Sequence, residues 1–307
     1  MVKKILFIIL CILLGGVYIF SAYAKLHPIE PFEYTFVDMG VSGWRMAPFI
    51  ARFFIGLEFF LGALFIFNFK IRTTAKISIA VLLFFSLYLV GLIFLTGNKG
   101  NCGCFGTYLV MTPLQALIKN AVMLVLTWGL YKYYNGFSFK KDFILFYALL
   151  LAAMVTPHIL NYVDLDYSAA YLSKKEDQYK IELDTLYKYA KVNTPPKSLS
   201  TGRHIIAFMS LTCPHCRIAA KKMKIIKEKN PDIPIYFVLN GDEKDFKPFF
   251  EDTKATNIPY CNLNGKGFIF LGGTILPYIC LVNNSTVETS VDYMHLDQEQ
   301  IESWLKK

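Results

Sequence analysis

Residues 205–216 read IIAFMSLTCPHC, an apolar run that ends in two cysteines separated by a Pro-His dipeptide. The run 205–209 predicts a buried strand, and the residues from Cys216 onward predict a helix. A Cys-x-x-Cys pair at a strand-to-helix turn is built for dithiol–disulfide exchange, because the helix N-terminus stabilises the thiolate of the first cysteine. The stretch therefore predicts an α/β domain in which Cys213 and Cys216 are redox-active.

The residues after this turn continue in β/α order. They predict a helix 216–228, a strand 233–239, a helix 243–253, a hairpin of 278–282 and 286–289, and a last helix 298–305. This order resembles the thioredoxin fold, and Leu276-Pro277 just before the hairpin supports the resemblance. The resemblance implies that Cys213 is the exposed nucleophile and Cys216 the buried resolving thiol. It also implies that Pro277 is a cis-proline that helps to dock the extended chain of a partner.

Two positions depart from ordinary thioredoxins. Thr212 stands where a tryptophan usually precedes the first cysteine, and Ala207 takes the strand position of a buried, proton-accepting aspartate. Pro214-His215 resembles the dipeptide of strongly oxidising members such as DsbA. A protonated His215 beside the helix start would stabilise the thiolate, and hence the reduced form, which raises the reduction potential. The dipeptide therefore favours a disulfide donor over a reductase.

The first half of the chain has the composition of a membrane domain. The chain has 307 residues, 54% of them hydrophobic, and a mean hydropathy of +0.39. Five apolar stretches are long enough to span a bilayer: 5–24, 47–69, 77–96, 113–131 and 143–160. We therefore expect an all-α polytopic membrane helix bundle with a four-helix core over residues 1–162. A tether over 163–200, helical from 174 to 191, and the thioredoxin-like domain over 201–307 are expected to follow.

The basic residues predict the orientation of the spans. They lie before span one and in the loops after spans two and four, at Lys3, Lys4, Lys70, Arg72, Lys76, Lys132, Lys140 and Lys141. The positive-inside rule places these groups, and the N-terminus, in the cytoplasm. Both thiol pairs then lie on the periplasmic side of the inner membrane, and the net charge of +9 reflects topology rather than nucleic-acid binding. Whether the first span is cleaved after Ala24 as a signal peptide stays open.

The second thiol pair, Cys102-Gly103-Cys104, is predicted to lie on the external loop between spans three and four. Two cysteines separated by one residue close only a small, strained disulfide ring, and strain makes such a bond more reducible. Gly103 lets the backbone adopt unusual dihedral angles next to the sulfurs. These features suit an electron relay, although loop cysteines without a role are the alternative. For Cys213 and Cys216 the alternatives are zinc or copper ligation, and no nearby Cys/His pair completes a zinc site.

Residues 1–135 are similar to the MauE/DoxX family of small four-helix membrane proteins. The matching residues are the run FSAYAKL at 20–26, Arg52, the segment 56–62, and the run CGCFG at 102–106. The resemblance implies redox work at the outer membrane face, because MauE-type proteins are associated with maturing disulfide-containing periplasmic subunits. A fifth span that leads into a fused thioredoxin-like domain departs from the minimal family and supplies a redox partner in cis.

Glu58 lies inside the second span, where a carboxylate is costly and is therefore a candidate functional group. We expect it to take up protons released on thiol oxidation, to contact a quinone headgroup, or to form a buried ion pair. The candidate partners for an ion pair are Arg52, Lys25 and Lys119. Of these, Arg52 and Lys119 are expected to extend toward the outer face of the membrane.

Together these features predict a membrane-anchored thiol–disulfide oxidoreductase. Cys213 and Cys216 are expected to take electrons from extracytoplasmic client thiols and pass them to Cys102 and Cys104, from which they leave to a membrane acceptor such as a quinone. Membrane lipid is an expected partner; a covalently bound cofactor, a metal ion and nucleic acid are not. Two alternatives stay open. One is a reductive relay that delivers electrons to external disulfides, and the other is a non-catalytic maturation or copper-handling factor.

Overall fold

The computed structural model describes residues 2–98, 101–106, 108–137, 142–163, 166–172 and 177–307. The chain divides into two compact units, Met1–Val163 and Asp164–Lys307. Each unit is described here by itself. Lys140 and Lys141, two of the basic residues used to predict the topology, lie outside the described residues.

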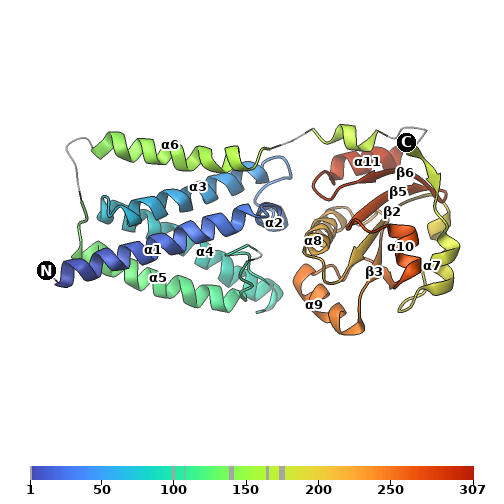
Figure 1. The fold of residues 1–307 in the computed structure, drawn as a ribbon, viewed down its shortest axis with the longest axis horizontal. Coiled ribbons are helices and arrows are strands. Elements are labelled where there is room, and N and C mark those ends of the chain that lie inside the picture. Colours follow the sequence, from blue (N-terminus) through green and yellow to red (C-terminus); the bar gives the residue numbers. More distant parts are fainter. Residues whose placement is uncertain (1, 99–100, 107, 138–141, 164–165, 173–176) are drawn as a thin grey trace. The chain divides into compact units, whose positions relative to one another are not determined.

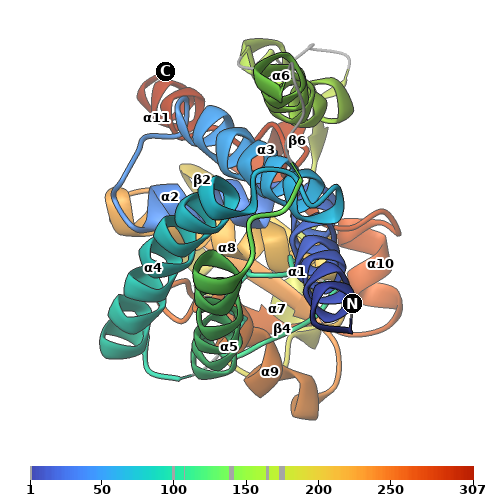
Figure 2. The ribbon, with the colours of Figure 1, turned by 90° about the vertical axis from the view of Figure 1, so that its left-hand side faces the viewer.

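Among its described residues, the first unit contains five helices that are long and apolar enough to cross a membrane. They are α1 (Val2–Leu26), α3 (Ala47–Ile66), α4 (Ile71–Thr96), α5 (Pro113–Tyr133) and α6 (Asp142–Leu160). Helix α1 packs along α3, and α4 packs along α5 (Figure 1). Figure 2 shows that α6 lies at the edge of the bundle beside α3, which is its principal neighbour. The five predicted spans are confirmed to within a few residues at most ends.

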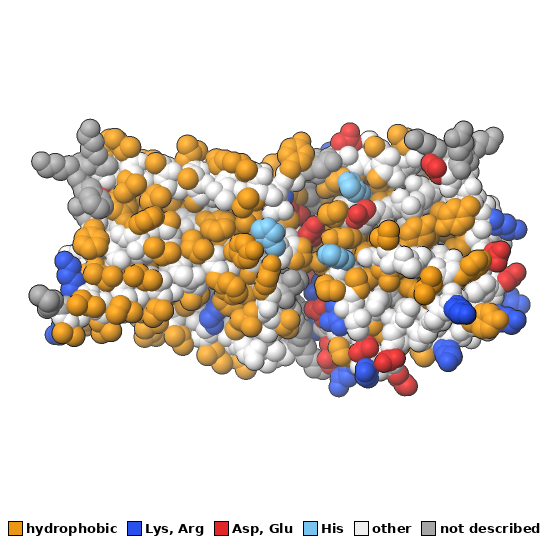
Figure 3. All heavy atoms as spheres, in the orientation of Figure 1, with side chains coloured by type: hydrophobic (Ala, Val, Ile, Leu, Met, Phe, Trp, Pro, Cys, Tyr) orange, Lys and Arg blue, Asp and Glu red, His pale blue; other side chains and the backbone are white. Residues whose placement is uncertain are grey.

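The outer surface of this bundle is apolar. Leu87, Val125 and Leu151 are 73%, 72% and 67% exposed, and hydrophobic side chains cover most of the face of this unit seen in Figure 3. A water-soluble bundle of this size would turn such side chains inward, whereas lipid covers them in a membrane. The first unit is therefore a multi-pass membrane domain.

A short helix that the sequence did not predict, α2 (Glu30–Asp38), lies between α1 and α3. It packs against α3, where Phe36 stacks on Phe54 with 5.7 Å between the ring centroids, and its Glu33 forms an ion pair with Arg52. Arg52 also donates a hydrogen bond to the backbone carbonyl of Asn161, at the end of α6. Its side chain is 3% exposed, so its charge is not left to solvent or lipid. It instead joins α2, α3 and the end of α6.

The second unit is built on a six-stranded mixed sheet of order β1-β6-β5-β2-β3-β4. The strands are β1 (Tyr179–Lys180), β2 (Arg203–Ser210), β3 (Ile235–Asn240), β4 (Tyr260–Asn262), β5 (Tyr278–Asn283) and β6 (Thr286–Val291). The helices are α7 (Leu183–Tyr189), α8 (Pro214–Lys229), α9 (Glu243–Thr253), α10 (Lys266–Gly272) and α11 (Gln298–Lys306). The central strand β2 runs parallel to β3 and antiparallel to β5. This is the predicted thioredoxin-like arrangement, with β4 and α10 as elements that the sequence did not predict.

The segment predicted as a tether folds instead with the second unit over much of its length. Strand β1 pairs with β6, and α7 contributes Leu183 and Leu186 to the core that also contains Ile206 and Phe208 of β2. The predicted helix 174–191 is replaced by a β1–α7 pair, and residues 174–176 lie outside the described residues. The mixed charges of this segment suggested a solvated chain, but its few apolar side chains cover one face of the sheet.

Candidate functional site

The first thiol pair lies where β2 passes into α8. Cys213 is the N-cap residue of α8 and is half-buried, and Pro214 occupies the first turn, where its missing N–H group costs no hydrogen bond. Cys216 is fully buried, and its sulfur accepts a hydrogen bond of 3.3 Å from the backbone N–H of Ser210. Burial raises the pKa of the Cys216 thiol, which donates a hydrogen bond to the Cys213 sulfur. The pair therefore offers one accessible sulfur and one shielded thiol.

Neighbouring side chains hold this turn in place. His215 is exposed and stacks on Tyr293, with 5.7 Å between the ring centroids. The Arg217 guanidinium donates two hydrogen bonds, of 3.2 and 3.1 Å, to the carbonyl oxygen of Leu211. Arg217 also forms an ion pair of 3.7 Å with Asp252. The contact of His215 with Tyr293 carries no local sequence signal, because the two residues are far apart in the chain.

Pro277 lies at the same edge of the sheet as the first thiol pair. The Leu276–Pro277 peptide bond is cis, as the resemblance to thioredoxins predicted. Tyr278 at the start of β5 pairs with Phe208 near the end of β2, so the residue before it comes level with the end of β2 where the thiol turn begins. Cys213, Cys216 and Pro277 are therefore brought together.

The second thiol pair lies on the loop between α4 and α5, and Asn101 organises this loop. The Asn101 side chain donates a hydrogen bond of 2.8 Å to the Gly106 carbonyl and accepts one of 3.1 Å from the Gly103 backbone N–H. Gly103 has φ +74°, as expected for a tight turn at the sulfurs. Cys102 is buried and Cys104 half-buried. Sequence analysis missed Asn101, although an asparagine that begins a Gly-containing turn is a recognisable signal.

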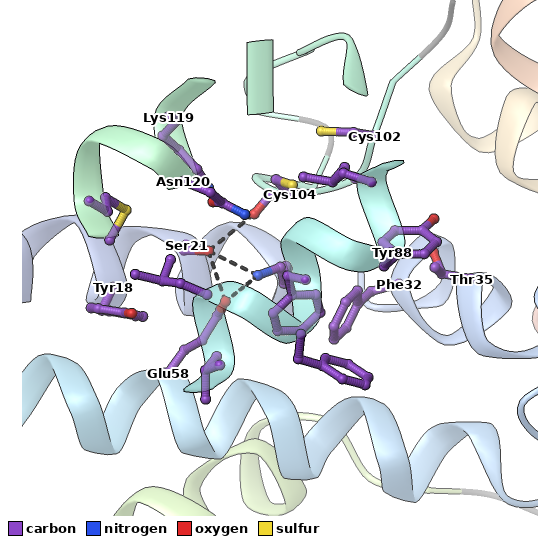
Figure 4. A pocket seen from close by; sticks show the side chains of 18 of the residues that line it. Tyr18, Ser21, Phe32, Thr35, Glu58, Tyr88, Cys102, Cys104, Lys119 and Asn120 are labelled. Atoms are coloured by element: carbon purple, nitrogen blue, oxygen red, sulfur yellow. Dashed lines mark hydrogen bonds and ion pairs between the residues drawn. The ribbon is translucent and has the colours of Figure 1, made fainter. Parts of the chain in front are cut away.

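A buried polar cluster lies directly beneath this loop (Figure 4). The Lys25 ammonium lies 2.5 Å from Oε1 of Glu58 and donates a hydrogen bond of 2.9 Å to the Ser21 hydroxyl. Ser21 Oγ also lies 3.1 Å from the backbone carbonyl oxygen of Cys104, to which it donates. Among the three cations considered from the sequence, Lys25 is thus the ion-pair partner of Glu58. Lys119 lies over the Phe105 ring instead, 4.6 Å from its centroid.

Both membrane cysteines and this cluster line one cavity. Its polar lining includes Glu58, Lys119 and Asn120, and its free volume is about 50 Å³. The second carboxylate oxygen of Glu58 is buried and has no hydrogen-bond partner among the described residues. A hydrogen bond from the Cys102 thiol, together with the positive charges of Lys119 and Lys25, lowers the pKa of Cys104 to about 6.

The fold and the two sites define a multi-pass membrane protein fused to a thioredoxin-fold domain, with one thiol pair in each part. The family described as methylamine utilisation protein MauE matches residues 3–132, so the membrane unit is similar to that family. The chain is also similar over almost its whole length to protein TlpB of Flavobacterium psychrophilum. The two are 29% identical, and the match covers 93% of this chain and 94% of that protein.

Two solved structures resemble the second unit. One is a secreted Mycobacterium tuberculosis disulfide oxidoreductase described as homologous to E. coli DsbE, with 16% identity and a TM-score of 0.32, covering 39% of this chain and 98% of that one. The other is the thioredoxin domain of a Bacteroides vulgatus thiol-disulfide oxidoreductase, with 16% identity and a TM-score of 0.28, covering 42% of this chain and 91% of that one.

Proposed function

We propose that the protein is a membrane-anchored thiol–disulfide oxidoreductase that relays electrons from client thiols through its two cysteine pairs to a membrane acceptor. One observation carries the proposal. In each pair a buried thiol, Cys216 or Cys102, lies beside a half-buried cysteine, Cys213 or Cys104. Burial raises the pKa of Cys216, and the hydrogen bond from Cys102 lowers the pKa of Cys104 to about 6. A thiolate beside a neutral thiol is the arrangement that disulfide exchange requires.

In the first step the client is oxidised and the soluble pair is reduced. A client thiolate attacks the Cys213–Cys216 disulfide at Cys213, forming a mixed disulfide and releasing the Cys216 sulfur as a thiolate that takes up a proton. A second client thiolate then attacks the mixed disulfide, leaving a client disulfide and a reduced pair. Two electrons have moved, and the buried Cys216 thiol is protected from other reagents.

In the second step the reduced soluble pair is oxidised by the Cys102–Cys104 disulfide through the same two exchanges. The reduced membrane pair then loses two electrons and its proton to an acceptor, for which a quinone is the proposed chemical class. A quinone dissolves in the bilayer and takes up two electrons and two protons. The thiol of the pair supplies one of these protons and water supplies the other, which balances the step. The positive-inside topology supports placing both pairs on the periplasmic side.

The proposed direction rests on two features of the chain. His215 beside the start of α8 favours the reduced form of the soluble pair and therefore its use as an oxidant. A reductive relay would need thiols reachable from the cytoplasm, and Cys11, which lies in α1, is fully buried. A reductive relay is the outcome that the tests below separate from the proposed one.

A trapped mixed disulfide tests the proposal. The variant Cys216→Ser/Cys104→Ser lacks the resolving thiol of one pair and one sulfur of the other. With oxidised glutathione supplied as the two-electron oxidant, Cys213 and Cys102 should form a stable intrachain disulfide, and two glutathione thiols are released. Mass spectrometry of the digested membrane protein should detect the linked peptides. The matched control Cys213→Ser/Cys104→Ser should give no such product. An absence of linked peptides in the first variant, with both thiols intact and alkylatable, would contradict exchange between the pairs.

A further inference from the structure

The charged groups around the membrane thiol pair are not balanced. Among the described residues lining the cavity, the ionisable side chains besides the thiols are Tyr18 and Lys25 of α1, Glu58 of α3, Tyr88 of α4 and Lys119 of α5. Two of these carry a positive charge at neutral pH and one carries a negative charge. The cavity therefore has a surplus of one positive charge, which a single thiolate would neutralise.

The two lysines that carry the positive charges both lie near Cys104. Lys119 is held over the ring of Phe105, the residue that follows Cys104, while Lys25 reaches the Cys104 backbone through the Ser21 hydroxyl. The Cys102 thiol donates its hydrogen bond to the Cys104 sulfur. Lys25 and Glu58 are buried, so their charges are screened less than surface charges would be.

We propose that Lys119 and Lys25 are positioning residues that hold the reduced membrane pair as a Cys104 thiolate and a Cys102 thiol, and thereby set its reduction potential. This inference rests on the proposed function, in which that pair accepts electrons. The reduction is Cys102–Cys104 disulfide plus two electrons and one proton, giving one thiol and one thiolate. Interactions that stabilise the thiolate stabilise the reduced form, which raises the potential.

Removal of the Glu58 charge should change the reduction potential of the membrane pair in the opposite direction to removal of a lysine. The Glu58 carboxylate faces the same cavity and opposes a negative charge on Cys104, so removing it should raise the potential that removal of a lysine lowers. A purely structural role predicts something different. Glu58 and Lys119 both hold groups next to the thiol loop, so structural damage from either substitution would lower the stability of the same loop rather than shift the equilibrium in opposite directions.

The experiment uses the full chain in lipid nanodiscs with Cys213→Ser and Cys216→Ser, so that only the membrane pair exchanges with glutathione buffers. Two glutathione thiols reduce the disulfide and leave as oxidised glutathione, and alkylation with mass spectrometry gives the reduced fraction. Lys119→Met should lower the equilibrium constant for reduction about tenfold, or about 30 mV, and Glu58→Gln should raise it. Lys119→Arg should restore the wild-type value. Glu33→Gln, which removes the carboxylate of the other buried ion pair, should leave it unchanged.

The inference would be overturned if Lys119→Met and Glu58→Gln changed the equilibrium constant for reduction in the same direction, or if Lys119→Met did not change it.

A second measurement, made with the lysines and Glu58 unchanged, applies even if one of these variants does not fold. At pH 7–8 the glutathione equilibrium should shift toward the reduced pair about tenfold per pH unit, about 30 mV. The reason is that two glutathione thiols release two protons, whereas the pair takes up only one. An equilibrium that does not change with pH would mean that both sulfurs of the reduced pair are protonated and would contradict the thiolate. Because this test omits the soluble pair, its failure is distinct from a failure of the relay.

Discussion

Cys213 and Cys216 are three positions apart, yet the structure gives them different chemistry. Cys213 begins α8 and is half-buried, whereas Cys216 lies one turn further along and is fully buried under β2. The sequence predicted these roles through the resemblance to thioredoxins. It did not reveal the Ser210 N–H group that contacts the Cys216 sulfur, because that contact depends on the bend between β2 and α8.

The two thiols of the soluble pair should differ in their reaction with iodoacetamide. Alkylation requires a thiolate, and burial raises the pKa of Cys216, so this residue stays protonated at neutral pH. With the pair reduced at pH 7.5, Cys213 should be modified at least about tenfold faster than Cys216. Raising the pH should speed the reaction of Cys216 only well above pH 9. Peptide mass spectrometry measures both rates, and equal rates at pH 7.5 would contradict the assigned roles.

The ion-pair partner of Glu58 is a feature that the sequence alone did not determine. Glu58 was identified as a candidate from its cost inside a span, but three lysine or arginine partners were equally compatible with the sequence. The bundle decides between them because α1 packs along α3 and brings Lys25 to Glu58. Arg52 is taken by Glu33 on α2, a helix that the sequence analysis did not predict.

At the scale of elements, the thiol loop fits closely against the end of α1. Gly106 has φ +57°, and a Cβ atom there would collide with the carbonyl oxygen of Ala24. Gly103 has φ +74° but no atom within 4 Å of the position of its Cβ. The two glycines therefore serve different purposes. Gly103 permits the turn, while Gly106 permits the approach of the loop to the helix.

Replacing Gly103 or Gly106 by alanine should show that one permits the turn and the other permits the close approach of the loop to α1. Gly103→Ala should cost about 1–2 kcal/mol through its positive φ alone and leave the thiol loop in place. Gly106→Ala adds a collision with the α1 backbone, so it should displace the loop and expose Cys102. Maleimide labelling of Cys102 in membranes measures this exposure. Similar labelling in both variants would contradict the close packing at Gly106.

Helix α7 is the element whose role differs most from the expectation. Leu186 lies in the segment predicted as a tether, yet it is fully buried in the core of the second unit. Leu186→Ala should therefore destabilise this unit by about 2–5 kcal/mol. Tyr189→Ala, at an exposed position of the same helix, should cost about 0.5 kcal/mol or less. Denaturant unfolding followed by tryptophan fluorescence measures both, and equal effects would place α7 outside the core.

At the scale of the whole molecule, composition predicted the five membrane helices and the thiol motif predicted the fold of the second unit. The boundary between the units was harder to predict, because β1 and α7 are short and carry many charges. Tyr171 of the short helix η1 (Ser168–Tyr171) is buried, so the second unit includes part of the segment that the sequence predicted as a tether.

The redox state of Cys213 and Cys216 in living cells tests the relay most directly. It is trapped by rapid acid quenching and alkylation, and compared between the wild type and the Cys102→Ser/Cys104→Ser variant. The oxidative relay predicts a mostly oxidised soluble pair in the wild type and a reduced one in the variant, because the membrane pair is the oxidant. A pair that is reduced in the wild type and oxidised in the variant would reverse the direction of electron flow. An unchanged pair would contradict any exchange between the two sites.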